Sequence, residues 1–479
     1  MVVGELAHER DLIIIGGGPG GYHAAIRAAQ LGQSVTLIEK DQWGGVCLNK
    51  GCIPSKIITH GAEKFASIRE SENIGIESKN VTFNMNTFTE YKHKTIKKLR
   101  ESVQLLCTAN KVEMIKGAAF FLSENKVGVE NGDQYNVYRF KHAIIATGSS
   151  PQAPEGIKVD NKRILDSWSI TSLDLIPENL FVYGSDYIAL EMSMAFEALG
   201  SQVTLILDNS KDDFDYDLSI NRELKRVFKK NQIQVIRNAS ISKAYSDEKA
   251  VTIILQNRNR IETITGTHLF TSSFAKPNIE NIGMDRIGIE TTESGFIKVN
   301  KQCQTTCSNI FAIGDVTEGP VLAVKAMKQG KVAAEAIAGI GAEADFRFIP
   351  AVAHTRPPIA SAGLTEQEAF AHGYEVEIGQ FPLSNNGYAG LIGKKDGFIK
   401  VIFDKKSKLL LGMHMIGDGA IELISSGILS LEMIARDEDL LFPLYPHPSI
   451  NEALLEAVEA LKNQAIHLTP NLKKERFNV

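Results

Sequence analysis

Two cysteines, Cys47 and Cys52, have four residues between them and lie just after a glycine-rich turn. A short Cys-x4-Cys pair in this context predicts a redox-active disulfide. The alternatives are two buried thiols or half of a zinc site. Zinc needs about four ligands, and no other His or Cys lies in the ten residues before Cys47. Gly51 and Pro54 suit a close approach of the backbone to a planar cofactor, so we favour the redox interpretation.

The turn that precedes the cysteines belongs to a strand–turn–helix pattern. The apolar run Asp11–Ile15 predicts a buried parallel strand, Ala24–Ala29 a helix, and Ser34–Glu39 a second strand. This is the pattern of a dinucleotide-binding unit, in which a helix N-terminus attracts a pyrophosphate. Glu39, 23 residues after Gly16, could accept hydrogen bonds from a ribose. The glycines of the turn are Gly16, Gly18 and Gly21.

Two other groups could take part in chemistry. Asn309–Asp315 predicts a strand that ends in Gly-Asp, and we expect Asp315 to bind a sugar-like chain; a helix N-cap is the alternative. His447 lies between two prolines, and Glu452 begins the helix that follows. Such a His–carboxylate pair could take a proton from a thiol, because the thiolate is the attacking species. The alternative is a histidine packed at a helix start.

The strand–turn–helix pattern occurs a second time, 168 residues later (Gly184 against Gly16). Leu180–Gly184 predicts a strand, Tyr187–Leu199 a helix, and Gln202–Leu207 a second strand. The duplication indicates two dinucleotide-binding units in one chain.

The other predicted elements surround these two units. Between them we expect a helical segment from about Thr59 to Leu106, strands over Val112–Glu130, and a buried strand over His142–Ser149. Pro151 and Pro154 mark a boundary. Later elements are helices near 324–337, 365–372 and 420–434 and strands near 374–380, 397–403 and 408–415.

Length and composition limit the class of protein. The chain has 479 residues, which suggests about three domains. Its net charge of −5 gives no indication of nucleic acid or an anionic membrane, and no apolar run is long enough to span a bilayer. The N-terminus lacks the basic start of a signal peptide. With five cysteines, the chain is not a disulfide scaffold, and we expect a cytoplasmic protein.

Together these motifs resemble the pyridine nucleotide–disulfide oxidoreductases. The run Cys47–Lys56 looks most like that of the dihydrolipoamide dehydrogenases, the E3 components of 2-oxoacid dehydrogenase complexes, and the likeness covers nearly the whole chain. It implies an α/β fold with two Rossmann-like dinucleotide-binding domains and a C-terminal α+β dimerisation domain. The implied boundaries are 1–150 (FAD-binding, first part, with the disulfide), 151–278 (NAD-binding-like), 279–348 (FAD-binding and central segment), 349–465 (dimerisation) and 466–479 (tail).

The resemblance also implies roles. Cys47 would exchange with a dihydrolipoyl substrate, Cys52 would contact the flavin, and His447, oriented by Glu452, would be the base delivered across a homodimer. Lys56 and Glu191 would form an ion pair beside the flavin N5. Electrons would pass through FAD to NAD+, and the partner would be the lipoyl domain of a 2-oxoacid dehydrogenase or a related lipoyl protein. The implied FAD-binding residues are Gly16, Gly18, Gly21, Glu39, Lys56, Gly117, Gly148, Asp315 and Ala323, and the implied NAD-binding residues are Gly184, Tyr187, Ala189 and Glu191.

The second unit departs from the family pattern. Asp186 stands where the second glycine lets the backbone approach a pyrophosphate, and Leu207 stands where an acid would bind the ribose. Two unit charges about 4 Å apart repel by roughly 4 kcal/mol at an effective dielectric constant near 20. We therefore expect either a working NAD site of altered affinity or a flavoprotein that has lost efficient NAD use. The acidic run 212–217 contains no Arg, which disfavours NADP.

Related enzymes fit less well. Mercuric and large thioredoxin reductases need additional C-terminal cysteines, and none follows Cys307. Glutathione reductase is disfavoured by the run Cys52–Lys56 and by the missing arginines. Cys303 and Cys307 have redox-like or metal-like spacing without partner ligands, which favours structural thiols. Two function classes stay open: an NAD-linked dihydrolipoyl dehydrogenase, and an FAD thiol–disulfide protein that uses another electron acceptor or acts mainly as a lipoyl-protein partner.

Overall fold

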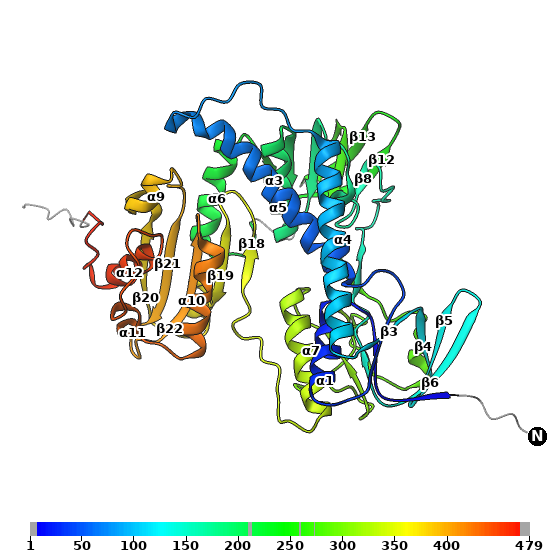
Figure 1. Ribbon diagram of the computed structural model, residues 1–479. Coiled ribbons are helices and arrows are strands. Elements are labelled where there is room, and N and C mark those ends of the chain that lie inside the picture. The colour runs from blue at the N-terminus through cyan, green and yellow to red at the C-terminus, as the bar shows by residue number, and fades with distance from the viewer. Residues whose placement is uncertain (1–6, 209–212, 258–259, 273, 470–479) are drawn as a thin grey trace, which may run out of the picture.

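The computed structural model describes residues 7–208, 213–257, 260–272 and 274–469. Figure 1 shows two units that contain parallel sheets, one at the bottom right and one at the top, with the C-terminal module at the left. The long helix α4 (Met85–Ala109) runs along both parallel-sheet units.

The first unit is built on a seven-stranded sheet. Its centre is β1 (Ala7–Ile15), which lies between β2 (Val35–Glu39) and β6 (Gln134–Ile145) in parallel register. The last residues of β1 and β6 are isoleucine, leucine and alanine that are buried, as expected for strands covered on both faces. The remaining strands are β3 (Glu113–Lys116), β4 (Ala118–Ser123), β5 (Lys126–Asn131) and β17 (Ile310–Ala312).

Helices cover this first sheet. α1 (Pro19–Gln30) follows the first glycine turn and packs against α7 (Ala323–Ile337), and the two lie side by side in Figure 1. The buried face of α1 consists of glycine and alanine, which permits close helix packing. Two further helices carry the cysteines: α2 (Gly45–Asn49) and α3 (Cys52–Glu70).

The second unit repeats this design. Its five-stranded sheet has the order β11-β10-β9-β15-β8, and every pair is parallel. The turn after β9 (Asn179–Tyr183) leads into α5 (Tyr187–Leu199). The other elements are β7 (Ser149–Gln152), β8 (Ile164–Leu165), η2 (Ile170–Ser172), β10 (Gln202–Ile206), α6 (Leu218–Lys230), β11 (Gln234–Ile236), β12 (Ala239–Ser246), β13 (Val251–Asn257), β14 (Arg260–Gly266), β15 (His268–Thr271) and β16 (Phe274–Pro277).

The C-terminal module is a five-stranded antiparallel sheet with the order β18-β19-β22-β21-β20. α10 (Ala420–Glu432) packs on β19 and β22, and α12 (Glu452–Glu459) packs on β20 and β21. The other elements from η3 onward are η3 (Met284–Arg286), η4 (Gly314–Val316), β18 (Ala351–Ala353), β19 (Ile359–Gly363), α8 (Glu366–Ala371), β20 (Val376–Pro382), η5 (Leu383–Asn385), α9 (Gly387–Leu391), β21 (Phe398–Asp404), β22 (Leu410–Ile416), α11 (Asp437–Leu441) and η6 (Ala460–Lys462).

The predicted α/β class and both strand–turn–helix units are confirmed, and the predicted helix Tyr187–Leu199 has the bounds of α5. The segment expected to be helical from about Thr59 to Leu106 is not one continuous helix. It contains parts of two helices, α3 and α4, with η1 (Ser71–Ile74) between them. Gly75, with φ of 83°, ends that turn, and Asn84 then caps α4 through its side chain. The strand expected over His142–Ser149 ends earlier, at Ile145. Most of the predicted tail, 470–479, lies outside the described residues.

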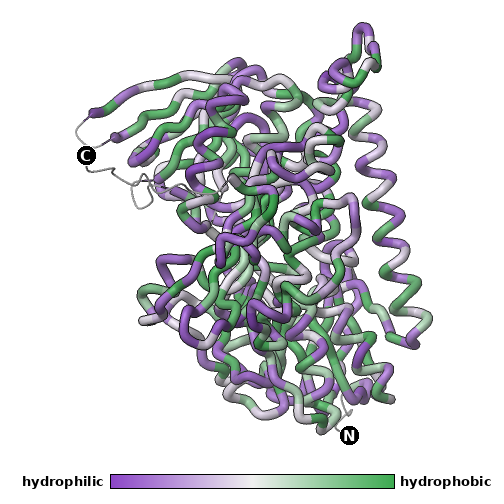
Figure 2. The backbone as a smooth tube through the Cα atoms, turned by 90° about the vertical axis from the view of Figure 1, so that its left-hand side faces the viewer, coloured by the Kyte–Doolittle hydropathy of each residue, from purple (hydrophilic) through white to green (hydrophobic). Residues whose placement is uncertain are grey.

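Hydrophobic and hydrophilic residues are interleaved along the chain in Figure 2 and do not gather into one long apolar stretch. Among the described residues, no helix is both long and apolar enough to cross a membrane.

A buried ion pair joins the second unit to the C-terminal module. Lys400 of β21 donates to Asp217, the N-cap of α6, over 2.8 Å, and to Glu366 over 2.7 Å. The Lys400 and Asp217 side chains are only 3% and 1% exposed. Burial raises the pKa of Asp217, but the hydrogen bonds from Lys400 and Ser219 outweigh it, so the pKa lies well below its usual range.

We expect Lys400→Met to lower the free energy of unfolding by about 3 kcal/mol, because it leaves the Asp217 carboxylate buried without its charge partner. Since the pKa of Asp217 is lower in the folded chain, its contribution is present above the ordinary aspartate pKa and is lost as the pH falls below it. Urea unfolding at pH 7 and at a pH well below 3.8, the ordinary aspartate pKa, measures both effects. Lys405→Met, in an exposed pair, is the control and should change little. An equal effect of the two variants would contradict the prediction.

Candidate active site

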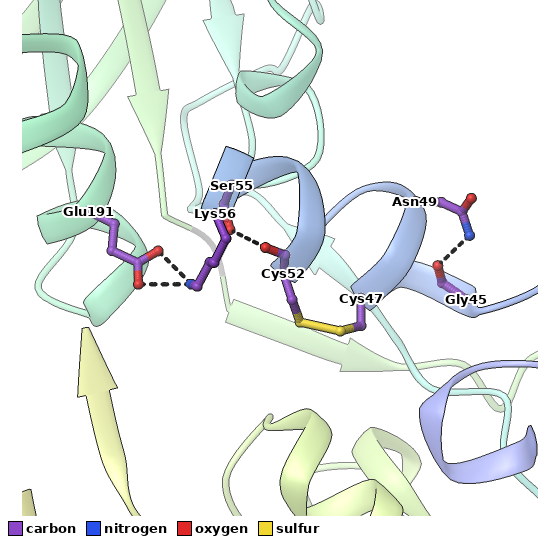
Figure 3. Close-up of a disulfide and its surroundings, with 7 residues drawn as sticks. All are labelled: Gly45, Cys47, Asn49, Cys52, Ser55, Lys56 and Glu191. Carbon is purple, nitrogen blue, oxygen red and sulfur yellow. Dashed lines mark hydrogen bonds and ion pairs between the residues drawn. A yellow bond between two sulfur atoms is a disulfide. The ribbon is translucent and has the colours of Figure 1, made fainter. Parts of the chain in front are cut away.

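The cysteine pair lies at the start of a long helix. Cys47 belongs to the short helix α2, Cys52 begins α3, and the structure joins them by a disulfide (Figure 3). Asn49 stabilises the turn that carries Cys47, because its side-chain amide donates to the Gly45 and Trp43 carbonyl oxygens over 2.8 and 3.0 Å. The predicted disulfide is therefore formed between two helices of the first unit.

The segment that carries the disulfide packs directly on the first glycine turn. A Cβ atom at Gly45, the first residue of α2, would lie 2.6 Å from Gly18 Cα. The backbone N–H of Gly44 also donates to the Gly17 carbonyl oxygen over 2.9 Å. This contact explains why the cysteines follow the turn so closely in the sequence.

The glycines of the first turn have no room for side chains of their own. Gly16 has φ of 112°, and a Cβ there would lie 2.2 Å from the Ala146 carbonyl oxygen. A Cβ at Gly21 would lie 1.8 Å from the Gly16 carbonyl oxygen. Glu39 ends β2 and accepts from Gly17 N–H over 2.7 Å and Asp41 N–H over 2.6 Å. The turn has the shape that a pyrophosphate requires.

The other residues predicted to bind FAD lie at the ends of the same elements. Gly117 N–H donates to the Glu39 carbonyl oxygen over 3.0 Å, and Gly148 follows β6. Asp315 lies in η4, accepts from Ser149 Oγ over 3.3 Å, and has a pKa raised by burial. Ala323 begins α7.

Sequence reasoning did not single out Thr147 as a site residue, although it lies within the Ala-Thr-Gly run after β6. Its buried hydroxyl oxygen has no hydrogen-bond partner within the described part of the chain. Such a group is typical of a site that a polar ligand completes. The residues at this end of the sheet therefore fit FAD.

A buried ion pair lies one turn along α3 from the disulfide. Lys56 Nζ lies 2.8 and 2.7 Å from the two carboxylate oxygens of Glu191, which is fully buried in α5 (Figure 3). The Glu191 carboxylate also accepts from the backbone N–H of His354 over 2.8 Å. Lys56 Nζ lies 5.5 Å from the centre of the Tyr187 ring. The predicted pair is thus formed, and it joins all three parts of the chain.

The predicted base lies in the C-terminal module. His447 Nδ1 lies 2.7 Å from Glu452 Oε1, and the second Glu452 oxygen accepts from Ser449 N–H over 2.9 Å. Burial raises the pKa of Glu452, but the hydrogen bond from His447 and the Ser449 N–H outweigh it and the pKa is lowered. The His447 side chain is 79% exposed. Figure 1 shows α12 on the side of the module that faces away from the other two units.

The second turn is closed by its own carboxylate. Asp186 is the N-cap of α5: one oxygen accepts from Ala189 N–H over 2.8 Å and the other from the Ser272 hydroxyl. Neighbouring protein atoms desolvate this carboxylate and raise its pKa despite these bonds, although part of the side chain reaches solvent. Gly184 approaches Ser272 closely, since a Cβ there would lie 2.7 Å from Ser272 Cβ. An anion of the chain therefore holds the helix N-terminus that a pyrophosphate would use.

The end of β10 is also altered. Leu207 is fully buried, and the Asp208 carboxylate accepts from the Tyr183 hydroxyl over 2.6 Å. Tyr216 packs against the same apolar cluster as Tyr187, and burial raises its pKa, with Glu191 and Asp186 adding to the effect. Sequence reasoning did not select Tyr216, since an isolated tyrosine in an acidic run has no motif.

The remaining cysteines do not form a second redox or metal centre. Cys303 is fully buried, and burial raises the pKa of its thiol to about 12. Cys307 donates to Asn309 over 3.1 Å. Over residues 7–208, 213–257, 260–272 and 274–469, no group of three His, Cys, Asp or Glu could hold a metal ion. Structural thiols, as predicted, agree with these positions.

Comparison with known families identifies the frame of this site. The model of the pyridine nucleotide-disulphide oxidoreductases matches residues 10–330, and the model of their dimerisation domain matches residues 349–458. The chain belongs to this family. It is an enzyme of the flavoprotein disulfide oxidoreductase type, and FAD and NAD are the cofactors of its family.

Relatives share almost the full length. The chain is 40% identical to dihydrolipoyl dehydrogenase of Geobacillus stearothermophilus, over 98% of this chain and 99% of the relative. It is 38% identical to dihydrolipoyl dehydrogenase of Bacillus subtilis, over 98% and 100%. LpdA of Mycobacterium tuberculosis has the same fold, with a TM-score of 0.88 at 24% identity over 94% of this chain and 99% of that one.

We expect Gly21→Ala to abolish FAD retention, because its Cβ would collide with the Gly16 carbonyl oxygen in the turn. Gly341→Ala is the matched control, since nothing lies within 4 Å of the Cβ it would add. The ratio of flavin to protein after purification measures the effect. A full flavin content in Gly21→Ala, at wild-type stability, would show that this turn does not bind FAD.

Proposed function

We propose that this enzyme oxidises dihydrolipoyl groups through the Cys47–Cys52 disulfide and FAD, and that its reaction with NAD+ is weakened by Asp186. The observation that carries the first part is the packing of α2 on the glycine turn, with Lys56–Glu191 one turn beyond the disulfide. The full-length likeness to dihydrolipoyl dehydrogenases supports the same substrate class.

In the proposed thiol–disulfide exchange, each bond that forms is matched by one that breaks, and the two cysteines take up the electron pair of the substrate. One substrate thiolate attacks Cys47, the Cys47–Cys52 bond breaks, and Cys52 leaves as a thiolate. The second substrate thiol attacks the sulfur bound to Cys47, so the substrate becomes a disulfide and Cys47 is released. FAD, when bound, supplies the ring that takes up this electron pair and passes it on. The Lys56–Glu191 ion pair would hold the charged Lys56 ammonium group in place beside that ring.

His447 is the proposed proton acceptor for the substrate thiols. Glu452 orients its imidazole through a 2.7 Å contact. Because the His447 side chain is 79% exposed, we propose that it serves the disulfide of a partner subunit. The match of residues 349–458 to the dimerisation domain supports a homodimer. A lipoyl domain is the proposed protein partner.

Asp186 favours a second candidate function, in which electrons leave by another acceptor. The carboxylate lies at the N-terminus of α5 and would repel a bound pyrophosphate. The buried Leu207 supplies no acid for the ribose, and Asp208 is already engaged by Tyr183. Both features would weaken dinucleotide binding without affecting the disulfide.

An anaerobic titration of the flavin absorbance tests this proposal. Dihydrolipoamide should reduce the wild-type flavin rapidly, and NADH should do so only at high concentration. Cys47→Ser should lose the reaction with dihydrolipoamide but keep its response to NADH. Failure of dihydrolipoamide to reduce the wild type would exclude the substrate class.

We expect Asp186→Gly to lower the NADH concentration for half-reduction by about tenfold, since it removes roughly 1.4 kcal/mol of charge repulsion. Asp186→Asn keeps an N-cap without the charge and should show most of this gain. Rapid reduction of the wild type by micromolar NADH would contradict the weakened site.

A further inference from the structure

A second His–Glu pair has its glutamate on the same helix, α12, as the first pair. His467 Nδ1 lies 2.6 Å from Glu456 Oε1, just as His447 Nδ1 lies 2.7 Å from Glu452 Oε1. Glu452 and Glu456 are four residues apart in α12, so both carboxylates project from one face of the helix. The Glu456 side chain is only 10% exposed.

The two pairs are held in matching ways. The second oxygen of each glutamate accepts a backbone N–H: Ser449 at 2.9 Å for Glu452, and His467 itself at 3.2 Å for Glu456. Two successive asparagines, at the end of η5 and at the N-cap of α9, hold the two loops. Asn385 donates to the His467 carbonyl oxygen over 2.7 Å, and Asn386 donates to the Ser449 carbonyl oxygen over 3.1 Å. The two histidine-bearing segments are therefore fixed side by side.

The charges around His467 come from α12. The hydrogen bond that His467 donates to the Glu456 carboxylate raises the pKa of His467, and Glu452 and Glu459 add to this effect. In turn, the charge of His467 helps to lower the pKa of Glu452. The effects of Glu452 on His467 and of His467 on Glu452 are one attraction, between the histidine of the second pair and the glutamate of the first.

Charged groups on the elements packed against α12 are paired elsewhere. Asp437 of α11 pairs with Lys462, and Glu377 of β20 pairs with Lys408. Lys400 of β21 is directed to Asp217 and Glu366. Glu438 and Asp439 of α11 complete the charged groups of that helix. Glu456 is therefore the carboxylate whose charge His467 balances.

We propose that His467 is a positioning residue that balances the charge of Glu456 beside the His447–Glu452 pair, and thereby sets the pH range in which His447 accepts a proton. This inference rests on the proposed role of His447 as the base. The alternative is that His467 only holds its own segment of chain against α12 and has no electrostatic effect on His447. The two differ in how a double variant behaves.

Removing one charge of the pair should matter, and removing both should not. His467→Gln leaves the Glu456 carboxylate unbalanced, which favours a protonated His447. We expect the midpoint of the acid limb for reduction by dihydrolipoamide to rise by about 0.1 pH unit, the size expected in water for one unit charge about 10 Å away once screening over one Debye length is included. Glu456→Gln should not raise the midpoint. The double variant H467Q/E456Q should return it to the wild-type value.

Stopped-flow reduction of the holoenzyme across pH gives the kinetic midpoint. NMR titration of histidine-labelled protein, assigned with His447→Gln, gives the imidazole midpoint without any turnover. His372→Gln, an exposed histidine bonded to the backbone of its own helix, is the matched control and should leave both midpoints unchanged.

The proposal is overturned if His467→Gln leaves the NMR midpoint of His447 unchanged, or if the double variant shifts it as far as the single one. A wild type that dihydrolipoamide does not reduce would reject the proposed function instead, and the NMR midpoints would still decide the role of His467.

Discussion

The buried carboxylate of Glu191 must be neutralised, and the structure depends on how this is done. An unpaired charge in the interior costs several kcal/mol or more. Lys56 supplies the charge from α3, and the backbone of His354 supplies a hydrogen bond from the C-terminal module. Because α3 begins at Cys52, neutralising Glu191 also fixes the disulfide relative to the other two parts of the chain.

The two strand–turn–helix units differ in what occupies the N-terminus of their first helix. Both have parallel pairing around their first strand, a glycine after that strand and a helix that follows it. In the first unit the helix N-terminus is left open for a ligand, since the N-cap is a glycine without a side chain. In the second, Asp186 occupies the cap and accepts two hydrogen bonds. A carboxylate of the chain thus competes with a phosphate for the same donors.

The acid–base groups follow a different principle, because they are placed by a helix and not by a sheet. α12 presents Glu452 and Glu456 on one face, and the loops on either side of the helix bring a histidine to each. Because the two carboxylates lie close together and carry like charges, the histidine that pairs with one of them also affects the electrostatic surroundings of the other. This arrangement lies at an exposed side of the module, where a second subunit would complete it.

The sequence by itself determined the two strand–turn–helix units, the helix Tyr187–Leu199 and the cysteine pair, because glycine turns and apolar periodicity are local signals. The residues alone also predicted the His447–Glu452 pair, while the resemblance carried by the motifs supplied the Lys56–Glu191 pair and the role of His447 as the base. Only the tertiary structure showed that Ser272 completes the cap with Asp186 and that His467 pairs with Glu456. It also showed that the buried hydroxyl oxygen of Thr147 has no hydrogen-bond partner among the described residues. The break between α3 and α4 also escaped the periodicity. These features join residues far apart in the chain, or depend on burial, and neither leaves a repeating pattern in the sequence.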